Sequence, residues 1–266
     1  MRDGEASGPT PALSDSAEAR VPLPSGEVHI WQADLDRAKL DLPALSALLS
    51  PDEQARAARF LRPSDRERYI AGRGLLRQLL SRYTGLPPES LRFVLGPNGK
   101  PGLSADCNPH MLQFNRTDSG SLALYAFCRE QRVGIDAETI PQTFDAEAIA
   151  RSFFHPHELA SLLSLPDAQR LPAFFACWTR KEAYLKARGE GLAFGLSRFE
   201  VSLLPGTPPC LLETPFDPSE TLRWSLYDVT VPSGYVAALA IETPASRPIT
   251  IRQFEASRAR KENTPL

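Results

Sequence analysis

Residues 178–192 read WTRKEAYLKARGEGL, and this stretch decides how the rest of the chain is interpreted. Its spacing predicts a helix that ends at Gly189 or Gly191. Glu182 and Lys186 are four residues apart, so the helix places them side by side on one face. An ordinary helix ion pair would explain this spacing, so its chemical meaning depends on acidic residues elsewhere in the chain.

The acidic residues that matter most lie in VGIDAE, residues 133–138, which predicts a strand. Alternate residues of a strand share a face, so Asp136 and Glu138 point the same way. Two solvated acids at a strand end are one explanation, and a cation held between the carboxylates is the other. With Glu182, the chain offers three hard oxygen donors on rigid elements, and Lys186 is one turn away. This set predicts Mg²⁺-assisted phosphoryl transfer, in which the metal neutralises phosphates and the lysine offsets leaving-group charge.

The basic residues are distributed unevenly. Of the 30 Lys and Arg residues only five are lysines, and eight arginines fall within residues 51–82. These arginines form either a surface for a phosphate or acidic partner, or the solvated faces of two helices. Within this stretch, Arg73 lies in the apolar turn IAGRGL, residues 70–75, where we expect a buried or bound anion. NGKP, residues 98–101, predicts a tight turn whose Lys100 reaches a phosphate or, the simpler explanation, stays in solvent.

The chain divides into two parts of similar pattern. Residues 1–25 and 244–266 lack periodicity, which predicts flexible tails. Strand and helix patterns occur in both 26–125 and 126–243, so we expect an α+β fold of two similar subdomains, each a small sheet packed on helices. The second subdomain carries the metal and catalytic motifs. The expected strands are residues 28–35, 91–95, 112–117, 121–128 and 132–138, followed later by RFEVSLL, RWSLYDVT and YVAALAIE. The expected helices lie within residues 42–61, 65–85, 144–154, 156–165 and 167–191.

Composition limits the classes of function. The chain has 266 residues, of which 42% are hydrophobic, and a formal net charge of −2. These values suit one large or two ordinary domains, and the balanced charge gives no field for holding nucleic acid or an anionic membrane. No apolar run approaches the roughly 18 residues of a membrane helix, and no signal peptide is visible, so we expect a soluble cytoplasmic protein.

The motifs of several other site classes are missing from the sequence. The four cysteines show no CxxC spacing and the four histidines no HExxH, so we expect no zinc site. We interpret the cysteines, together with His155 and His157, as structural. The sequence also has no P-loop, no GxGxxG and no nucleophile elbow.

In this order, the motifs resemble those of the Sfp-type 4′-phosphopantetheinyl transferases. The resemblance runs from about Ser50 to Ile241, through SPDEQARAARF, RYIAGRGLLR, GKP, FNRTDSG, VGIDAE, FF-x-x-x-E and WTRKEAYLKARGEGL. It implies two halves related by a pseudo-two-fold axis, with coenzyme A (CoA) in the cleft between them. It also implies transfer of the 4′-phosphopantetheine arm of CoA to a serine of an acyl, peptidyl or aryl carrier protein, with release of 3′,5′-ADP. Because the shorter related transferases must trimerise to build the site, a chain of this length is expected to act as a monomer.

The resemblance also implies roles for individual residues. Asp136, Glu138 and Glu182 are implied as Mg²⁺ ligands, and Lys186 as a charge stabiliser or proton donor near the phosphates. Glu182 is then the nearest base for the carrier serine, directly or through a water. The implied CoA-binding residues are Arg73, Gly99, Lys100, Pro101, Thr117 and Asp118.

One position departs from the family pattern. The family reads FN-x-S-H-S where this chain has FNRTDS, residues 114–119, so Asp118 replaces a histidine that contacts a phosphate of CoA. Asp118 would repel that phosphate unless Arg116 or a rotated side chain compensates. The departure leaves open a variant that prefers another pantetheine donor, and a catalytically impaired homologue that still binds carrier proteins. A third alternative is another Mg²⁺ phosphotransferase.

A docking surface for the carrier is expected at two places. Carrier domains tend to present an acidic helix, which would be attracted to the arginine-rich residues 56–82, with Arg59 and Arg62 as the arginines to test. The apolar region at Phe153 and Phe154 is the other place.

Overall fold

The structure is a computed structural model, and it describes residues 20–36, 40–191 and 194–256. The first part of the chain forms β1 (Glu27–Asp34), α1 (Leu42–Ala47), α2 (Pro51–Ala58), α3 (Pro63–Thr84), β2 (Phe93–Leu95), β3 (Pro101–Leu103), β4 (Leu112–Ser119) and β5 (Leu122–Arg129). The second part forms β6 (Val133–Thr139), α4 (Ala146–Phe153), α5 (Pro156–Ser164), α6 (Asp167–Arg188), β7 (Glu200–Val201), β8 (Leu211–Glu213), α7 (Glu220–Arg223), β9 (Ser225–Asp228), β10 (Tyr235–Ile241) and β11 (Thr250–Glu255).

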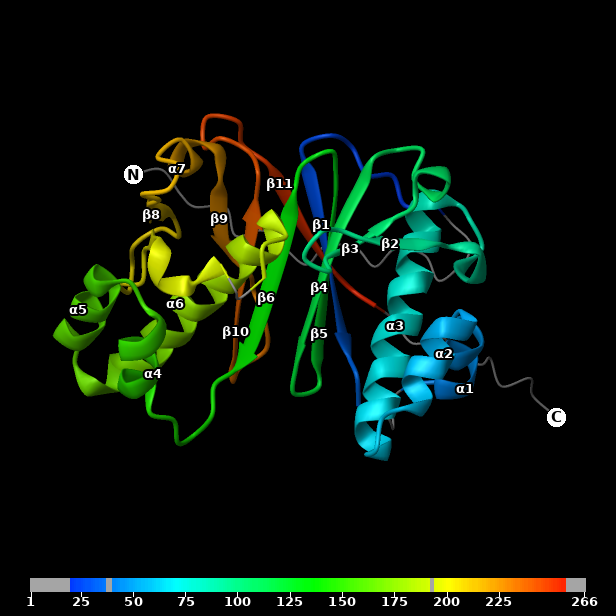
Figure 1. The fold of residues 1–266 in the computed structure, drawn as a ribbon, viewed down its shortest axis with the longest axis horizontal. Helices are drawn as coiled ribbons and strands as arrows, with labels where there is room; N and C mark the ends of the chain where they lie inside the picture. The colour runs from blue at the N-terminus through cyan, green and yellow to red at the C-terminus, as the bar shows by residue number, and fades with distance from the viewer. Residues whose placement is uncertain (1–19, 37–39, 192–193, 257–266) are drawn as a thin grey trace, which may run out of the picture.

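Two sheets pack against each other in the centre of the molecule, with the long helices α3 and α6 on their outer sides (Figure 1). The first sheet has the strand order β11-β1-β5-β4, and the second has the order β6-β10-β9. Within them, β1 and β11 are parallel and the other pairs are antiparallel. The expected α+β fold of two subdomains, each a small sheet packed on helices, is confirmed.

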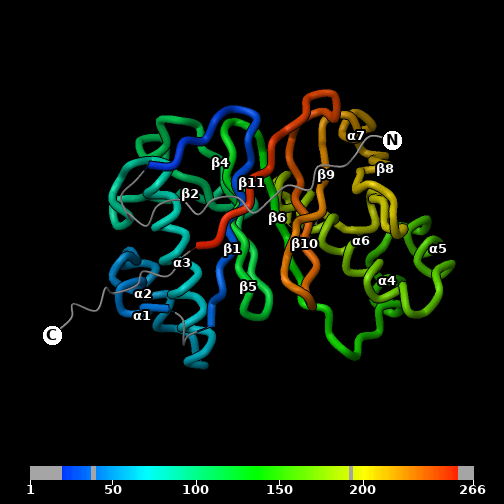
Figure 2. Tube along the Cα trace, turned by 180° about the vertical axis from the view of Figure 1, so that it is seen from behind, coloured from blue at the N-terminus to red at the C-terminus, as the bar shows by residue number. Residues whose placement is uncertain are grey.

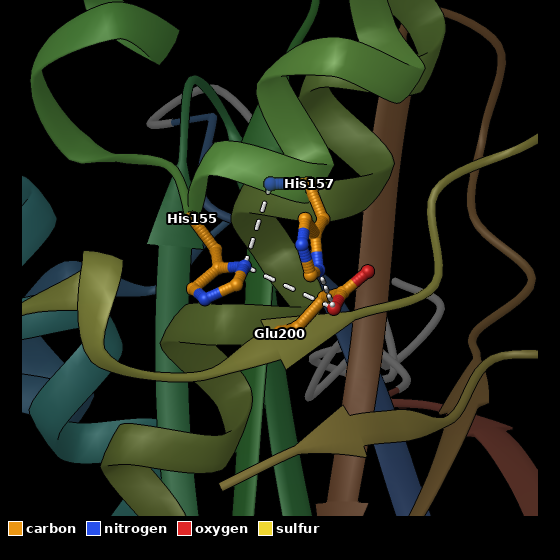
Figure 3. A group of neighbouring side chains, drawn as sticks. All are labelled: His155, His157 and Glu200. Carbon is orange, nitrogen blue, oxygen red and sulfur yellow. Dashed lines mark hydrogen bonds and ion pairs between the residues drawn. The ribbon is translucent and has the colours of Figure 1, made fainter. Parts of the chain in front are cut away.

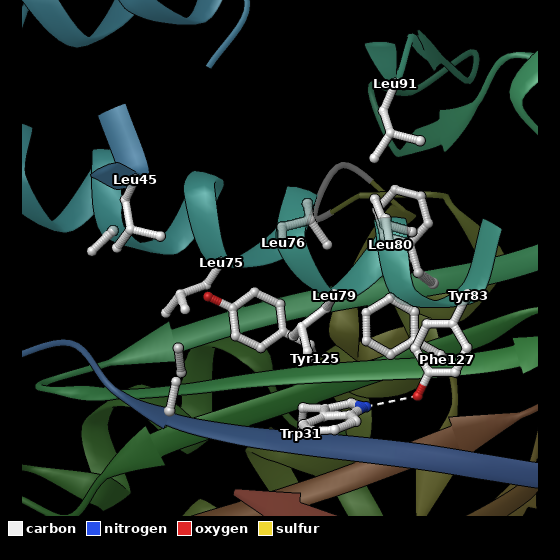
Figure 4. Close-up of a cluster of buried hydrophobic side chains, with 14 of the residues drawn as sticks. Trp31, Leu45, Leu75, Leu76, Leu79, Leu80, Tyr83, Leu91, Tyr125 and Phe127 are labelled. Atoms are coloured by element: carbon white, nitrogen blue, oxygen red, sulfur yellow. Dashed lines mark hydrogen bonds between the residues drawn. The ribbon is translucent and has the colours of Figure 1, made fainter. Parts of the chain in front are cut away.

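Alternate residues of the central strands enter different hydrophobic cores. Trp31 of β1 and Phe127 of β5 pack beneath α3 (Figure 4), whereas Ile30 and Ala126 pack against the second sheet. A strand buried on both faces needs apolar residues at successive positions. This explains why residues 122–128, LALYAFC, form a continuous apolar run instead of an alternating one.

Three helix ends lie at the residues that the sequence predicts, whereas α3 begins at Pro63, two residues before its expected range. Ser50 and Glu53 form a capping box at the start of α2, in which the Ser50 N–H donates to Glu53 Oε2 at 3.0 Å. Gly85 ends α3 with φ 74° and Gly189 ends α6 with φ 75°, in the left-handed region that favours glycine. Within the described residues, no helix combines the length and the apolar character needed to cross a membrane.

The expected C-terminal tail is wrong in part, because residues 250–255 form β11. This strand pairs with β1, and its Phe254 stacks on Trp31 with the ring centroids 4.8 Å apart. Figure 2 shows the strand returning from the second half of the chain to the first sheet. The last strand therefore belongs to the N-terminal sheet and links the two halves.

The expected subdomain boundaries also shift. The boundary between residues 125 and 126 falls inside β5, and the second sheet begins with β6 at Val133. At the start of the chain, Val21 and Leu23 are buried in the core, so the expected N-terminal tail ends before residue 25. Residues 1–19 of that tail lie outside the described residues.

Candidate active site

Close packing of β6 on α6 brings the acidic motifs together. Asp136 is fully buried on β6 and contacts Lys186 of α6, and Glu138 lies two residues further along the same strand face. Gly134 makes this approach possible, because a Cβ atom at that position would lie 2.1 Å from the backbone oxygen of Ala183. A larger residue would push the strand away from the helix that carries the third carboxylate.

Burial and mutual repulsion disfavour the ionised forms of the three carboxylates. Burial raises the pKa of Asp136, and the ammonium of Lys186 opposes that shift. Burial, and then the charge of Asp136, raises the pKa of Glu138. The same two causes raise the pKa of Glu182 to about 7. Three acidic groups in one partly desolvated place would all ionise readily only with a cation among them.

Two carboxylate oxygens of this site have no hydrogen-bond partner among the described residues. Asp136 Oδ2 and Glu182 Oε1 are buried and unpaired, although buried polar atoms are nearly always satisfied. Unpaired oxygen atoms of this kind fit a hard divalent cation, which takes carboxylate oxygens as ligands. The ligand atoms of Asp136, Glu138 and Glu182 do not form a group gathered within 4.8 Å of one another, so binding would have to draw them closer.

Lys186 and Thr117 complete the hydrogen bonding around Asp136. Lys186 Nζ donates to Asp136 Oδ1 at 2.5 Å and to Thr117 Oγ1 at 3.1 Å. The Thr117 hydroxyl in turn donates to Asp136 Oδ1 at 3.2 Å. Thr117, expected as a CoA-binding residue, is thus next to Lys186 and the metal-ligand candidates.

Side chains of β4 tie the first sheet to β6. The backbone N–H of Ile135 donates to Asn115 Oδ1 at 2.8 Å, and Ser119 Oγ donates to Glu138 Oε2 at 3.1 Å. Asn115, Thr117 and Ser119 occupy alternate positions of β4, so their side chains project from one face of that strand. The sequence reasoning did not assign Asn115 or Ser119 a role, although the alternation within FNRTDS was the signal that could have found them.

The charge of Asp118 is compensated within the protein. Asp118 is exposed, and its Oδ1 accepts a hydrogen bond from Arg116 Nη2 at 2.6 Å. The Arg116 guanidinium packs over the bare Cα of Gly72 on α3, where an added Cβ would lie 2.2 Å from Nη2. Arg116 therefore supplies the compensation that the departure from the family pattern requires.

The anion expected near Arg73 is a carboxylate of the protein itself. Arg73 Nε donates to Glu53 Oε1 at 2.5 Å, and Arg77 Nε donates to Glu53 Oε2 at 2.6 Å. Arg77 is fully buried and also donates to the backbone oxygens of Pro88 and Leu91. Glu53 thus serves both arginines and the capping box of α2. The role of Arg73 in CoA binding stays a prediction.

Lys181 of WTRKEAYLKARGEGL and Lys100 of NGKP each contact other groups of the protein. Lys181 is completely buried, where it pairs with Glu158 Oε1 at 2.6 Å. Lys100 Nζ donates to the backbone oxygens of Val133 at 2.8 Å and Ala187 at 3.1 Å, and burial lowers its pKa to about 8. The simpler explanation for NGKP, a turn whose lysine stays in solvent, is therefore wrong. The remaining residues of the motif are Gly99, in the turn with φ 86°, and Pro101, the first residue of β3.

Comparison with known proteins covers both halves of the chain. Residues 35–130 match the family model described as 4′-phosphopantetheinyl transferase, N-terminal, and residues 132–240 match the 4′-phosphopantetheinyl transferase superfamily. The junction between the two matches coincides with the junction between β5 and β6.

Three similar proteins are phosphopantetheinyl transferases by name, and each matches this chain over most of its own length. The chain is 42% identical to 4′-phosphopantetheinyl transferase HetI of Nostoc sp., over 82% of this chain and 89% of that protein. It is 31% identical to 4′-phosphopantetheinyl transferase Sfp of Bacillus subtilis, over 63% of this chain and 77% of that protein. A human protein, L-aminoadipate-semialdehyde dehydrogenase-phosphopantetheinyl transferase, is 28% identical over 74% of this chain and 68% of its own length. The chain belongs to the 4′-phosphopantetheinyl transferase family.

Proposed function

We propose that the protein transfers the 4′-phosphopantetheine arm of CoA to a serine of an apo carrier protein and releases 3′,5′-ADP. The single observation that carries this proposal is the arrangement around Asp136, where Lys186 contacts Asp136 and one oxygen each of Asp136 and Glu182 is buried without a partner among the described residues. The family membership supports the reaction type, and the resemblance noted for the sequence motifs supports the donor and acceptor.

Asp136, Glu138 and Glu182 would hold Mg²⁺. The donor set consists of carboxylate oxygens, and two of them are buried without a partner, which fits this ion. When bound, Mg²⁺ would neutralise phosphate charge and act as a Lewis acid. Ser119 would fix the orientation of Glu138 through its hydroxyl.

The protein side chains would handle the proton and the developing charge. Glu182, with its pKa raised to about 7, accepts a proton at neutral pH more readily than an ordinary carboxylate, which suits a base for the carrier serine. The serine oxygen bonds to the β-phosphorus as the bond from that phosphorus to the leaving oxygen of 3′,5′-ADP breaks. Lys186, which is held beside Asp136 and Thr117, offsets the charge on the departing phosphate.

CoA would be bound by residues of the first half of the chain, on α3, the turn between β2 and β3, and β4. Arg73, Gly99, Lys100, Pro101, Thr117 and Asp118 remain the proposed contacts. Pairing of Asp118 with Arg116 supports an intact CoA site over a damaged one, because the pair carries no net charge toward a phosphate.

The carrier would dock beside α2. Arg56, Arg59 and Phe60 line an open groove there, with Asp52 and Ala55 completing it. Two arginines beside an exposed ring suit an acidic amphipathic helix. Of the other region considered, Phe154 is buried and only Phe153 is substantially exposed.

We also propose a monomer that works in the cytoplasm. Both halves of the proposed site come from one chain, so a second copy is not needed to complete it. The four cysteines are free thiols, three of them buried, as is usual in a reducing compartment.

The direct test is to incubate the protein with an apo carrier protein, CoA and Mg²⁺ and to weigh the carrier by mass spectrometry. We expect an added phosphopantetheine mass that depends on all three reagents. No added mass with any of several carriers would overturn the proposal. Calorimetry tests the first alternative, since carrier binding without CoA binding would identify an impaired homologue. A reaction with ATP in place of CoA would identify another phosphotransferase.

A further inference from the structure

Three side chains outside the carboxylate motifs lie together where α5 meets β7 (Figure 3). His155 is the N-cap of α5, His157 lies in its first turn, and Glu200 is the first residue of β7. Among the residues that the structure describes, they form a group whose possible ligand atoms all lie within 4.8 Å of one another. Two imidazoles and a carboxylate in such a group are the ligand set of many zinc sites.

Two of the distances in this group are close to the ligand separation around a tetrahedral ion. The Nδ1 atom of His157 lies 3.1 Å from Glu200 Oε2, and the Nδ1 atom of His155 lies 3.8 Å from the same oxygen. Zinc bonds of about 2.0–2.1 Å at tetrahedral angles separate two ligand atoms by roughly 3.3 Å. The observed distances lie on either side of this value, so small rotations of the side chains would suffice.

The scaffold around the group is rigid on one side and open on the other. Glu158 is buried and accepts from the backbone N–H of His155 and from that of Val201, each at 2.8 Å, which fixes α5 against β7. The side chains of His155 and Glu200 are each 15% exposed, whereas that of His157 is 68% exposed. An ion could therefore enter from solvent at His157 and keep a water as its fourth ligand.

We propose that His155, His157 and Glu200 bind a transition-metal ion of the Zn²⁺ class. Imidazole nitrogen suits Zn²⁺ and related ions, whereas Mg²⁺ prefers oxygen ligands, so this ion is distinct from the Mg²⁺ assigned to the carboxylates. The partial positive charge at the start of α5 opposes a cation, and the negative charge of Glu200 offsets it. The bound ion joins α5 to β7 and stabilises the C-terminal half.

The sequence patterns for zinc could not reveal this group. Its histidines are two residues apart instead of the four of HExxH, and Glu200 follows His157 by 43 residues. The expectation that the histidines are structural remains the alternative. In that case the ring of His157 donates to or accepts from Glu200 with no metal involved.

The first experiment counts bound zinc. The full chain is stripped with a chelator, dialysed against dilute Zn²⁺ in a large excess of Mg²⁺, and analysed for metal by mass spectrometry. We expect one zinc per chain in the wild type and in the control His110→Ala, which removes an exposed histidine outside the proposed site. We expect none in His157→Ala or Glu200→Gln. Wild type without zinc, or variants that retain it, would overturn the proposal.

A second variant and readout separate metal binding from folding. His155→Asn removes the imidazole and keeps a good N-cap residue, so α5 should form while zinc is lost. Zinc should raise the melting temperature of the wild type and leave that of His155→Asn and His157→Ala unchanged. Equal shifts in all three proteins would contradict the site. Glu182→Gln should keep its zinc, which distinguishes this ion from one at the carboxylates.

Discussion

Glu182 illustrates how neighbours decide the chemistry of a single residue. Its carboxylate differs from most surface acids because it is partly buried beside Asp136, which raises its pKa to about 7. We predict that Glu182→Gln lowers kcat by at least about 100-fold, the lower end of what a general base contributes, and more if a metal ligand is lost as well. The measurement is the rate of carrier modification at saturating CoA.

The matched control for this variant is Glu147→Gln. Glu147 is an exposed glutamate whose ion pair with Arg151 lies within α4. We expect it to keep wild-type turnover, and both variants to keep the wild-type circular-dichroism spectrum. A Glu182→Gln protein that has lost its helical signal would instead assign the residue a structural role.

His29 makes stability depend on pH. Its ring is buried, and Nδ1 lies 2.9 Å from Tyr83 Oη while Nε2 lies 3.2 Å from Glu27. Because Trp31 donates to Tyr83 Oη, the tyrosine hydrogen is available for a neutral His29. Burial lowers the pKa of His29 below its ordinary value of 6.5, so the folded state binds fewer protons than the unfolded state. Stability should therefore fall as pH decreases through 6.5 and be fully reduced below the lowered pKa.

The test compares wild type with His29→Gln by urea unfolding between pH 7.5 and about 5, near and below the ordinary histidine pKa. The neutral amide cannot titrate, so the variant should lose less unfolding free energy than the wild type over this range. The difference between the two slopes isolates His29 from the other histidines. Equal slopes would show that protonation of His29 does not drive the acid sensitivity.

Individual site residues were predictable where the signal was local. The shared face of Asp136 and Glu138 follows from strand alternation, and the helical spacing of Glu182 and Lys186 from four residues of sequence. The sequence predicts an anion beside Arg73 but does not identify it as Glu53, because 20 residues and a turn between helices separate Glu53 from Arg73. Pairing across such distances depends on how the elements pack.

At the scale of elements, the contact between β6 and α6 should be the most sensitive in the site. In Gly134→Ala, the new Cβ would meet the backbone of Ala183 and Ala187, which has no rotamer to change. Overpacking costs typically 1–3 kcal/mol, and a backbone clash belongs at or above the upper end. We predict a loss of about 3 kcal/mol or more in unfolding free energy, together with loss of turnover.

Gly102→Ala is the matched control for this substitution. Gly102 lies in β3, and an added Cβ there would meet no atom of the described residues within 4 Å. We expect its unfolding free energy in urea to stay within about 0.5 kcal/mol of the wild type, as for most surface substitutions. If Gly134→Ala is equally stable, the strand and helix are less closely packed than the structure indicates.

Long periodic elements were predictable from sequence, and the short strands β3, β8 and β11 were not. The helices α3 and α6 each carry a long apolar pattern with a terminal glycine; α3 ends at Gly85 as predicted, and α6 ends at Gly189, one of the two predicted positions. The strand β11 is six residues long, is only half-buried, and follows a polar segment rich in proline. Its partner β1 lies more than 200 residues earlier, so no local pattern could reveal the parallel pairing.

The whole molecule is held together by contacts that cross between its halves. A shared hydrophobic core lies between the two sheets, and β11 returns from the second half to the first. The turn between β2 and β3 adds a third connection, since Asn98 Nδ2 donates to the backbone oxygen of Gly189 at 2.9 Å. Because the proposed site draws residues from β4, β6 and α6, its geometry depends on these connections.

Lys100 makes two of the polar contacts of that turn with the second half, and its removal tests whether the halves are coupled through it. Its ammonium reaches from the first half to the backbone oxygens of Val133 and Ala187, at the start of β6 and the end of α6. Lys100→Met keeps the length of the side chain but leaves these oxygens without their donor, which costs about 1–3 kcal/mol. Arg92→Met is the control, because Arg92 is 69% exposed and its pairing with Asp106 should contribute about 0–1 kcal/mol. We therefore expect the melting temperature of Lys100→Met to fall well below that of the control. If Lys100→Met keeps its stability and only requires more CoA for half-maximal rate, the lysine acts mainly on a phosphate of CoA and the halves are coupled elsewhere.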